Sequence, residues 1–488
     1  MKLRIGALLA TVLALTVTPG AAAQPVPSAV MVLEGKGFGH GVGMAQDGAL
    51  AMGTQGASLP DILAAFYPGT ALARRAGSVR VDLLESPRPA VVVAFPNGGE
   101  VRDAQAGPQS SGFPVKVSPG GSVRLGVDGG RYRATPLSGA TPAVPPRPAP
   151  PPATPPPPTT PPPPPPSAPA RPPTSTTTTA TTKPPPAPAP EPVSARPLWA
   201  IPRGGGTVAV PDLSRRYRGT LQVEGAGGGF QLVNNVDVEQ YLRGMGEVLE
   251  PGWPAAGLQA QAVAARTYAL RAMATDGRLC STQQCQVYLG AEAEYAAMDQ
   301  AVADTLSQVV VFDGALAETV YSASGGGVSA TPEEGFGTPD AEYPYLRSAP
   351  YPTADPQPWA LRLSLDELAR TLGYSGRPSG ARVSRTGPSG RALELTVDGD
   401  AGPVSVEGRR VADRLALRST LFTVRMDTGD PSSAGATEQL APGAEVPPAL
   451  APAPDLLGRR REPWVALAVL LLAGWGTAAV RWAPLRRL

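Results

Sequence analysis

The sequence has one histidine, two cysteines and a formal net charge of only +2. Proteins that bind nucleic acid usually concentrate lysine and arginine on one surface, so this nearly balanced composition argues against a nucleic-acid partner. With a single histidine, no Ser-His-Asp pattern is visible that would mark a serine as a nucleophile. No cofactor is expected either. The chemistry has to be sought in carboxyl, amide and hydroxyl side chains.

An apolar run lies near each end of the chain. A basic start, an apolar stretch and small residues ending at Ala23 are typical of a signal peptide over residues 1–23. Near the other end the apolar run Trp464–Val480 would measure roughly 26 Å as a helix, close to the ~30 Å hydrocarbon core of a bilayer. We therefore predict an exported protein at the cell surface, anchored in the cytoplasmic membrane by a C-terminal transmembrane helix at 463–482.

The two cysteines, Cys280 and Cys285, are five positions apart. In an exported protein such a close pair favours a disulfide that closes a small loop, because the compartment is oxidising. A zinc site is the alternative interpretation. Two thiolates would fill only half of its tetrahedral shell, and His40 is far away in the sequence, so we expect no metal site.

Composition divides the rest of the chain. Residues 28–139 contain short runs of strand-forming residues between Gly, Pro and Asn turns, which predicts a β-rich module. Residues 140–197 are a Pro/Thr-rich linker, expected to be a semi-rigid spacer. Residues 198–427 alternate strands with one strong helix, Pro254–Ala274, and residues 428–462 are expected to be a disordered linker. The predicted fold class is α+β, with a β-rich N-terminal module, an α+β catalytic domain with one long helix, and the transmembrane helix.

Three segments contain recognisable motifs. They are the Tyr-Leu-x-Gly-x-Gly-Glu-Val run at 241–248 with Ala-Gln-Ala-Val-Ala-Ala-Arg-Thr-Tyr at 260–268, the Tyr-Ser-Ala-Ser-Gly-Gly run at 321–326, and the Gly-His-Gly-Val-Gly-Met-Ala-Gln run at 39–46. Together they resemble the stage II sporulation protein D and amidase-enhancer family. In that family the Gly-His-Gly-Val-Gly-Met motif follows the catalytic segment, whereas here it precedes it.

The resemblance implies a lytic transglycosylase acting on peptidoglycan glycan strands. Such an enzyme cleaves the bond between N-acetylmuramic acid (MurNAc) and N-acetylglucosamine (GlcNAc), favours strands without stem peptides, and leaves a 1,6-anhydro sugar. One carboxyl group suffices, because it protonates the glycosidic oxygen and then takes the proton from the C6 hydroxyl. By position in the Gly-Glu-Val motif the candidate is Glu247, and Glu250 is its rival. Apolar neighbours of Glu247 would raise its pKa, as a general acid near neutral pH requires.

The other candidate residues are expected to bind substrate. Gln261 and Arg266 are five residues apart on the predicted helix and face different sides, so one is expected to hold substrate or the glutamate and the other to brace the fold. The resemblance also implies that His40 lines the substrate groove, although a lone histidine is more often structural. The remaining candidates are Gln46, with Ser322, Ser324 and Gly325 of the Ser-Gly-Gly loop.

Two other functions remain open at this point. The amidase-enhancer branch of the family suggests a noncatalytic activator of a cell-wall amidase. A membrane-tethered glycan-binding scaffold is the other alternative. Products released from cell wall would distinguish the enzyme from both.

Overall fold

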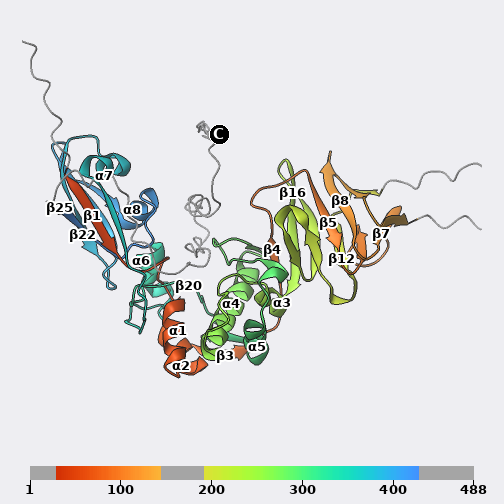
Figure 1. The fold of residues 1–488 in the computed structure, drawn as a ribbon, viewed down its shortest axis with the longest axis horizontal. Helices are drawn as coiled ribbons and strands as arrows, with labels where there is room; N and C mark the ends of the chain where they lie inside the picture. The colour runs from red at the N-terminus through yellow and green to blue at the C-terminus, as the bar shows by residue number, and fades with distance from the viewer. Residues whose placement is uncertain (1–28, 144–191, 428–488) are drawn as a thin grey trace, which may run out of the picture.

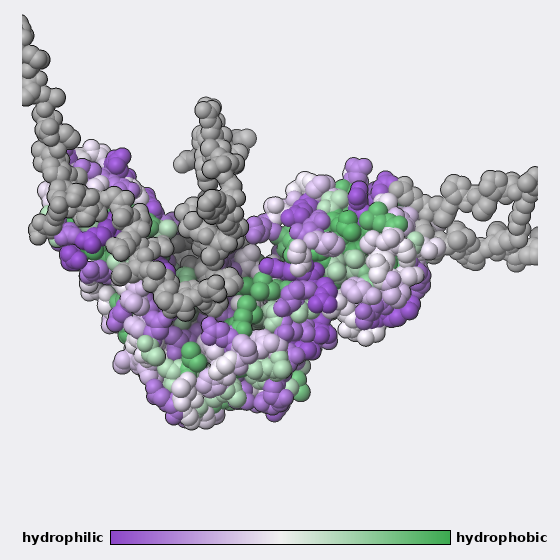
Figure 2. All heavy atoms as spheres, in the orientation of Figure 1, coloured by the Kyte–Doolittle hydropathy of each residue, from purple (hydrophilic) through white to green (hydrophobic). Residues whose placement is uncertain are grey.

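The computed structural model describes residues 29–143 and 192–427. Figure 1 shows these residues as three parts in a row: a small sheet lobe at one end, a helical centre around α4 (Ala255–Thr275), and a β-sandwich at the other end. On the face drawn in Figure 2, hydrophobic residues gather over the sandwich and near its junction with the helices, among mainly hydrophilic surface.

The β-sandwich consists of two sheets whose buried side chains share one hydrophobic cluster. All neighbouring strands are antiparallel except β17 and β4, which run parallel. In spatial order the first sheet is β10 (Ala140–Ala143), β7 (Gly112–Val117), β6 (Gly99–Arg102), β12 (Leu198–Pro202), β15 (Thr220–Ala226), β16 (Gly229–Asp237), β4 (Ser78–Asp82) and β17 (Leu279–Cys280). The second is β11 (Val193–Ser194), β9 (Arg131–Pro136), β8 (Gly121–Asp128), β5 (Ala90–Phe95), β13 (Val208–Val210) and β14 (Arg215–Tyr217).

The helical centre forms around α4, which is almost entirely buried from Gly257 to Leu270. Its many alanines have side chains small enough for neighbouring elements to pack closely on every side. The other elements of this part are α1 (Gln46–Thr54), α2 (Leu59–Phe66), α3 (Val238–Arg243), α5 (Ala296–Asp304) and α6 (Pro332–Phe336), the sheet β19 (Ala315–Leu316), β18 (Gln308–Phe312) and β3 (Ala71–Arg74), and the parallel pair β2 (Met44–Ala45) and β20 (Tyr321–Ser322).

The small sheet lobe has a hydrophobic cluster of its own. One of its sheets places β1 (Val30–Gly35) between β21 (Trp359–Ser364) and β25 (Phe422–Asp427). The other contains β22 (Pro378–Thr386), β23 (Ala392–Gly399) and β24 (Val404–Glu407), and the helices are α7 (Leu365–Leu372) and α8 (Gly408–Arg414). The Ser364 hydroxyl caps α7 by accepting a hydrogen bond from the backbone N–H of Glu367.

The predicted fold class was wrong in treating the N-terminal strands as a separate module. Within the described ranges these strands are shared among all three parts: β1 pairs with β21 and β25, β2 with β20, β3 with β18, and β4 with β16. Alternating hydrophobicity identifies a strand but not its neighbour, and here the neighbours are more than 200 residues away for three of these four strands. The strands on either side of 144–191, β10 and β11, both belong to the sandwich.

The predicted transmembrane helix is also not supported. Within 29–143 and 192–427 no helix is both long enough and apolar enough to cross a bilayer. The longest, α4, has 21 residues but contains Gln261, Arg266 and Arg271, and it packs inside the protein. The segment chosen for the membrane helix, 463–482, lies outside the described residues, as do the predicted signal peptide at 1–23 and the linker at 428–462.

Candidate active site

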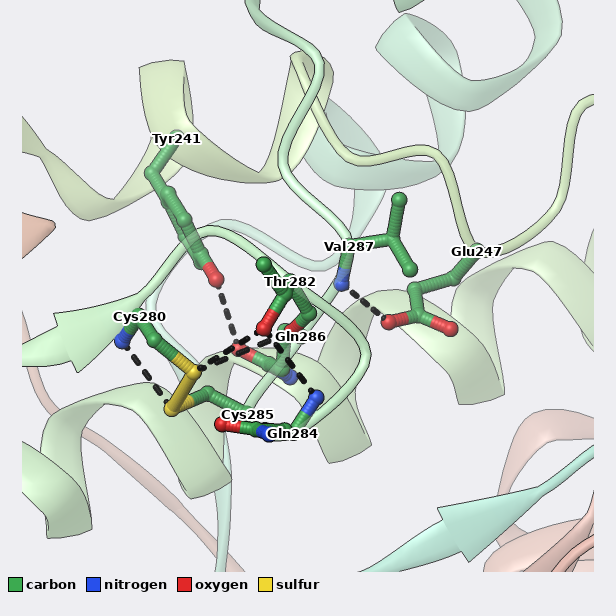
Figure 3. Close-up of a disulfide and its surroundings, with 8 residues drawn as sticks. All are labelled: Tyr241, Glu247, Cys280, Thr282, Gln284, Cys285, Gln286 and Val287. Atoms are coloured by element: carbon green, nitrogen blue, oxygen red, sulfur yellow. Dashed lines mark hydrogen bonds between the residues drawn. A yellow bond between two sulfur atoms is a disulfide. The ribbon is translucent and has the colours of Figure 1, made fainter. Parts of the chain in front are cut away.

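Glu247 lies in the loop between α3 and α4, with its side chain turned into the protein. The residue is 8% exposed, and the Val287 N–H donates a 2.6 Å hydrogen bond to its Oε1 (Figure 3). The Gly246 N–H donates in turn to the Val287 carbonyl at 2.8 Å. A side chain at Gly246 would lie 2.6 Å from Leu289, so the close approach of these two segments requires glycine there.

The electrostatics of Glu247 suit a proton donor. Burial raises the pKa of its carboxyl to about 7, against the opposing effect of hydrogen bonds from the Val287 N–H and the Tyr321 side chain. At neutral pH a large fraction of the protein therefore has Glu247 protonated. Glu250, the rival candidate, is exposed at the surface, outside this buried setting.

A small pocket opens beside Glu247. Its lining is apolar except for Glu247 and Gln261, and consists of Leu242, Met245, Glu247, Val248, Gln261, Ala262, Ala265 and Met298. The Gln261 Oε1 accepts a 3.2 Å hydrogen bond from the Gln46 Nε2, and both side chains are buried. The Gln261 Nε2 has no hydrogen-bond partner among the described residues. A buried amide N–H without a partner is costly, so this group is suited to bind a ligand oxygen.

Behind the carboxyl, three side chains form a hydrogen-bonded row. The Tyr241 hydroxyl donates to the Gln286 Oε1 at 2.9 Å, and the Gln286 Nε2 donates to the Tyr321 Oη at 2.9 Å. Burial raises the pKa of Tyr321 well above its usual range, so its hydroxyl remains protonated. The sequence predictions did not include these residues as site residues. Tyr321 and Tyr241 lay within quoted motifs, but nothing marked Gln286.

A disulfide lies directly before Gln286 and Val287 in the chain. Cys280 and Cys285 are joined, with their Cα atoms 5.5 Å apart (Figure 3). Gln286 and Val287, the next two residues, provide the hydrogen bonds described above. The disulfide therefore closes a short loop, residues 281–284, directly before the two residues that make these hydrogen bonds. Among the described residues no three histidine, cysteine or acidic side chains cluster in a way that could hold a metal ion.

Arg266 lies away from the pocket lining and braces the helices. It is fully buried, and its Nη2 and Nε bond the Glu239 carboxylate at 2.6 and 3.0 Å, which ties α4 to α3. It also donates to the Gln308 carbonyl in β18 at 3.1 Å. Of the two helix candidates, the structure thus places Gln261 at the pocket and gives Arg266 a structural position.

His40 has both ring nitrogens occupied by backbone groups. Its Nδ1 accepts from the Val42 N–H at 3.0 Å, so its Nε2 carries the proton and donates to the Tyr321 carbonyl at 3.0 Å. Burial and the nearby Arg391 cation lower the pKa of His40 to about 3. The imidazole is therefore neutral, and it holds the Gly-His-Gly segment against β20 rather than presenting a free nitrogen to a substrate.

The Ser-Gly-Gly loop is also tied to the N-terminal motif. The Ser324 hydroxyl donates to Asp47 at 2.7 Å, and the Gly325 N–H donates to the Tyr351 hydroxyl at 2.6 Å. Ser322 differs, because its hydroxyl is buried and has no partner within the described chain. The structure therefore brings Gln46 to the pocket through its hydrogen bond to Gln261, whereas Ser322 lies against Gly39 of the Gly-His-Gly motif. Ser324 and Gly325 make their hydrogen bonds within the protein.

Comparisons with known proteins address the family. Residues 226–312 match the family model SpoIID, stage II sporulation protein; this stretch contains Glu247, Gln261 and Gln286 but neither Tyr321 nor His40. An uncharacterised protein of Brachyspira hyodysenteriae is 31% identical over 179 residues, which are 34% of this chain and 48% of that protein, so the match spans about half of the relative's length. No solved structure matches. The chain thus contains a stage II sporulation protein domain, of a family linked to cell-wall remodelling.

Proposed function

We propose that this protein is a peptidoglycan lytic transglycosylase that cleaves the MurNAc–GlcNAc bond, preferentially in strands without stem peptides. The observation that carries the proposal is Glu247, a buried carboxyl with a pKa of about 7 beside a pocket. A group that acts first as acid and then as base works best with a pKa near the working pH. Glycosidases with two catalytic carboxyls keep them about 5 to 9 Å apart, and no second acidic residue lines the pocket in the described chain.

In the proposed reaction, protonated Glu247 gives its proton to the glycosidic oxygen as the bond from MurNAc C1 breaks. The GlcNAc side leaves with a free hydroxyl, and positive charge develops at C1. The Glu247 carboxylate then takes the proton of the MurNAc C6 hydroxyl, whose oxygen bonds to C1. The product is a 1,6-anhydro ring, Glu247 is protonated again, and no water is consumed.

The surrounding groups support this reaction by stabilising the Glu247 carboxylate that forms after the first proton transfer. The Val287 N–H and the Tyr321 hydroxyl both favour the charged form of Glu247, and the Val287 N–H already donates to its carboxyl. The Gln261 Nε2, which has no partner among the described residues, can donate to a sugar hydroxyl or acetamido oxygen at the pocket.

The test is mass spectrometry of glycan strands, with and without stem peptides, after incubation with the purified full-length chain. We expect 1,6-anhydro ends from the wild type and none from Glu247→Gln. Glu250→Gln is the matched control, because it changes a nearby exposed glutamate and should keep the activity.

Other outcomes would contradict the proposal. Activity that survives in Glu247→Gln would exclude this residue as the acid. Strand binding without any product would favour a glycan-binding scaffold, and stimulation of an added cell-wall amidase without product would favour the activator.

A further inference from the structure

The Gln286 side chain is fully buried and makes hydrogen bonds on both sides of its amide. Its Nε2 lies 3.3 Å from the Ala265 carbonyl oxygen in α4 and 2.9 Å from the Tyr321 Oη. Its Oε1 lies 2.9 Å from the Tyr241 Oη. One amide thus joins the long helix, α3 and β20 at a point directly behind Glu247.

These contacts fix the direction of every hydrogen bond in the row. The Ala265 carbonyl can only accept, so the NH₂ side of Gln286 must face it and the amide oxygen must face Tyr241. The same NH₂ group donates to the Tyr321 Oη. A hydroxyl has a single hydrogen, and that of Tyr321 must therefore point away from Gln286.

A hydrogen bond from the Tyr321 side chain is among the causes that lower the pKa of Glu247, so we take the Glu247 carboxyl as the acceptor of the Tyr321 hydroxyl. The other titratable groups that respond to the charge of Glu247 are Tyr241 of α3 and Tyr268 of α4. Burial raises the pKa of both tyrosines above their usual range, so they remain neutral. In the described part of the chain, no charged side chain is among the groups that shift the pKa of Glu247.

We propose that Gln286 is a positioning residue, which orients the Tyr321 hydroxyl so that it donates to Glu247. Tyr241 supports it by holding the amide oxygen from the opposite side. In catalysis the effect is greatest once Glu247 has lost its proton, because the oriented hydroxyl then stabilises a full negative charge. The catalytic effect of Gln286 rests on the proposed function, whereas the orientation of the Tyr321 hydroxyl by Gln286 does not.

The test measures the pKa of Glu247 directly, by NMR of the full-length protein with ¹³C-labelled glutamate carboxyls. The Glu247 signal is identified by its loss in Glu247→Gln. Gln286→Met keeps a side chain of similar length but has no N–H, so Tyr321 loses the bond that orients it. We expect the pKa of Glu247 to rise by about half a pH unit or more, and the high-pH limb of the rate profile to move with it.

A double-mutant cycle separates this role from a general packing effect. If Gln286 acts through Tyr321, then Gln286→Met added to Tyr321→Phe should give the same Glu247 pKa as Tyr321→Phe alone. Tyr288→Phe is the matched control. It removes another buried tyrosine hydroxyl, which donates to Asn234 at 2.8 Å, and should leave the Glu247 pKa unchanged.

The proposal is overturned if folded Gln286→Met keeps the wild-type pKa, or if the two substitutions shift the pKa additively. If Gln286→Met does not fold, Tyr241→Phe is tested in its place and should raise the pKa of Glu247 by a smaller amount. A Tyr241→Phe variant without any rise would also overturn the proposal. A wild type that forms no anhydro ends would refute the proposed function while the pKa coupling between Gln286 and Glu247 remained measurable.

Discussion

Replacing Glu247 by glutamine should stabilise the folded protein above neutral pH while it abolishes the proposed cleavage. The reason is that the pKa of this buried carboxyl is about 7, against an ordinary value of 4.5. A carboxyl with a raised pKa binds more protons in the folded state than in the unfolded state between these two values. Folding stability therefore falls as the pH rises from about 4.5 to about 7, and the loss is complete above that range.

The size of the effect follows from the two pKa values. One pH unit of separation corresponds to about 1.4 kcal/mol, so the ionised Glu247 destabilises the fold by about 3 kcal/mol above pH 7. Glutamine carries no charge at any pH and can still accept the Val287 N–H. Its free energy of unfolding should therefore exceed that of the wild type by about 3 kcal/mol at high pH, and by much less at low pH.

Urea denaturation of the wild type and Glu247→Gln at about pH 5 and about pH 8 measures this difference. Glu250→Gln is the control, because it removes a nearby exposed carboxylate outside the buried site. A Glu247→Gln advantage of the same size at both pH values would refute the reasoning. It would mean that this carboxyl does not change its proton occupancy on folding in that range.

Three further predictions follow from the same site. Because Glu247 must begin protonated, the rate of anhydro-end formation should fall as the pH rises above about 7, and a rate that rises there would contradict the role of this acid. Reducing the Cys280–Cys285 disulfide loosens the segment that leads into Val287, so the cleavage rate should fall several-fold and recover on reoxidation; an unchanged rate in verified reduced protein would show that the disulfide does not position the Val287 N–H. Arg266→Leu leaves the Glu239 carboxylate without its bidentate partner and should lower the free energy of unfolding by about 3 to 5 kcal/mol, with the pH profile of any remaining activity unchanged; a shifted profile would place Arg266 in the site after all.

Local features of the chain could be predicted from the sequence because they depend on neighbouring residues. A long helix occurs at Ala255–Thr275, where the sequence predicted one over Pro254–Ala274. The Gly-Glu-Val motif singled out Glu247, whose catalytic role stays a prediction. The close approach of Gly246 to Leu289 gives a physical reason for glycine before this glutamate.

Three-dimensional relationships could not be predicted in this way. The sequence suggested a separate N-terminal module, but β1 lies between β21 and β25. The residues of a strand do not specify which strand pairs with it, and here the partners are hundreds of residues away in the chain. His40 and Arg266 have residue types that suit a binding site. Only the tertiary structure shows that backbone groups and Glu239 already occupy their polar atoms.

The sequence by itself determined the stage II sporulation protein domain at residues 226–312, the candidate acid and the long helix, because each depends on a short contiguous pattern. The tertiary structure decided which groups act on that acid. Val287, Gln286 and Tyr321 come from two segments 34 residues apart, and their hydrogen bonds to each other and to Glu247 exist only after the disulfide loop and β20 pack together. The raised pKa of Glu247 has the same origin, since burial is a property of the folded chain and not of any residue in it.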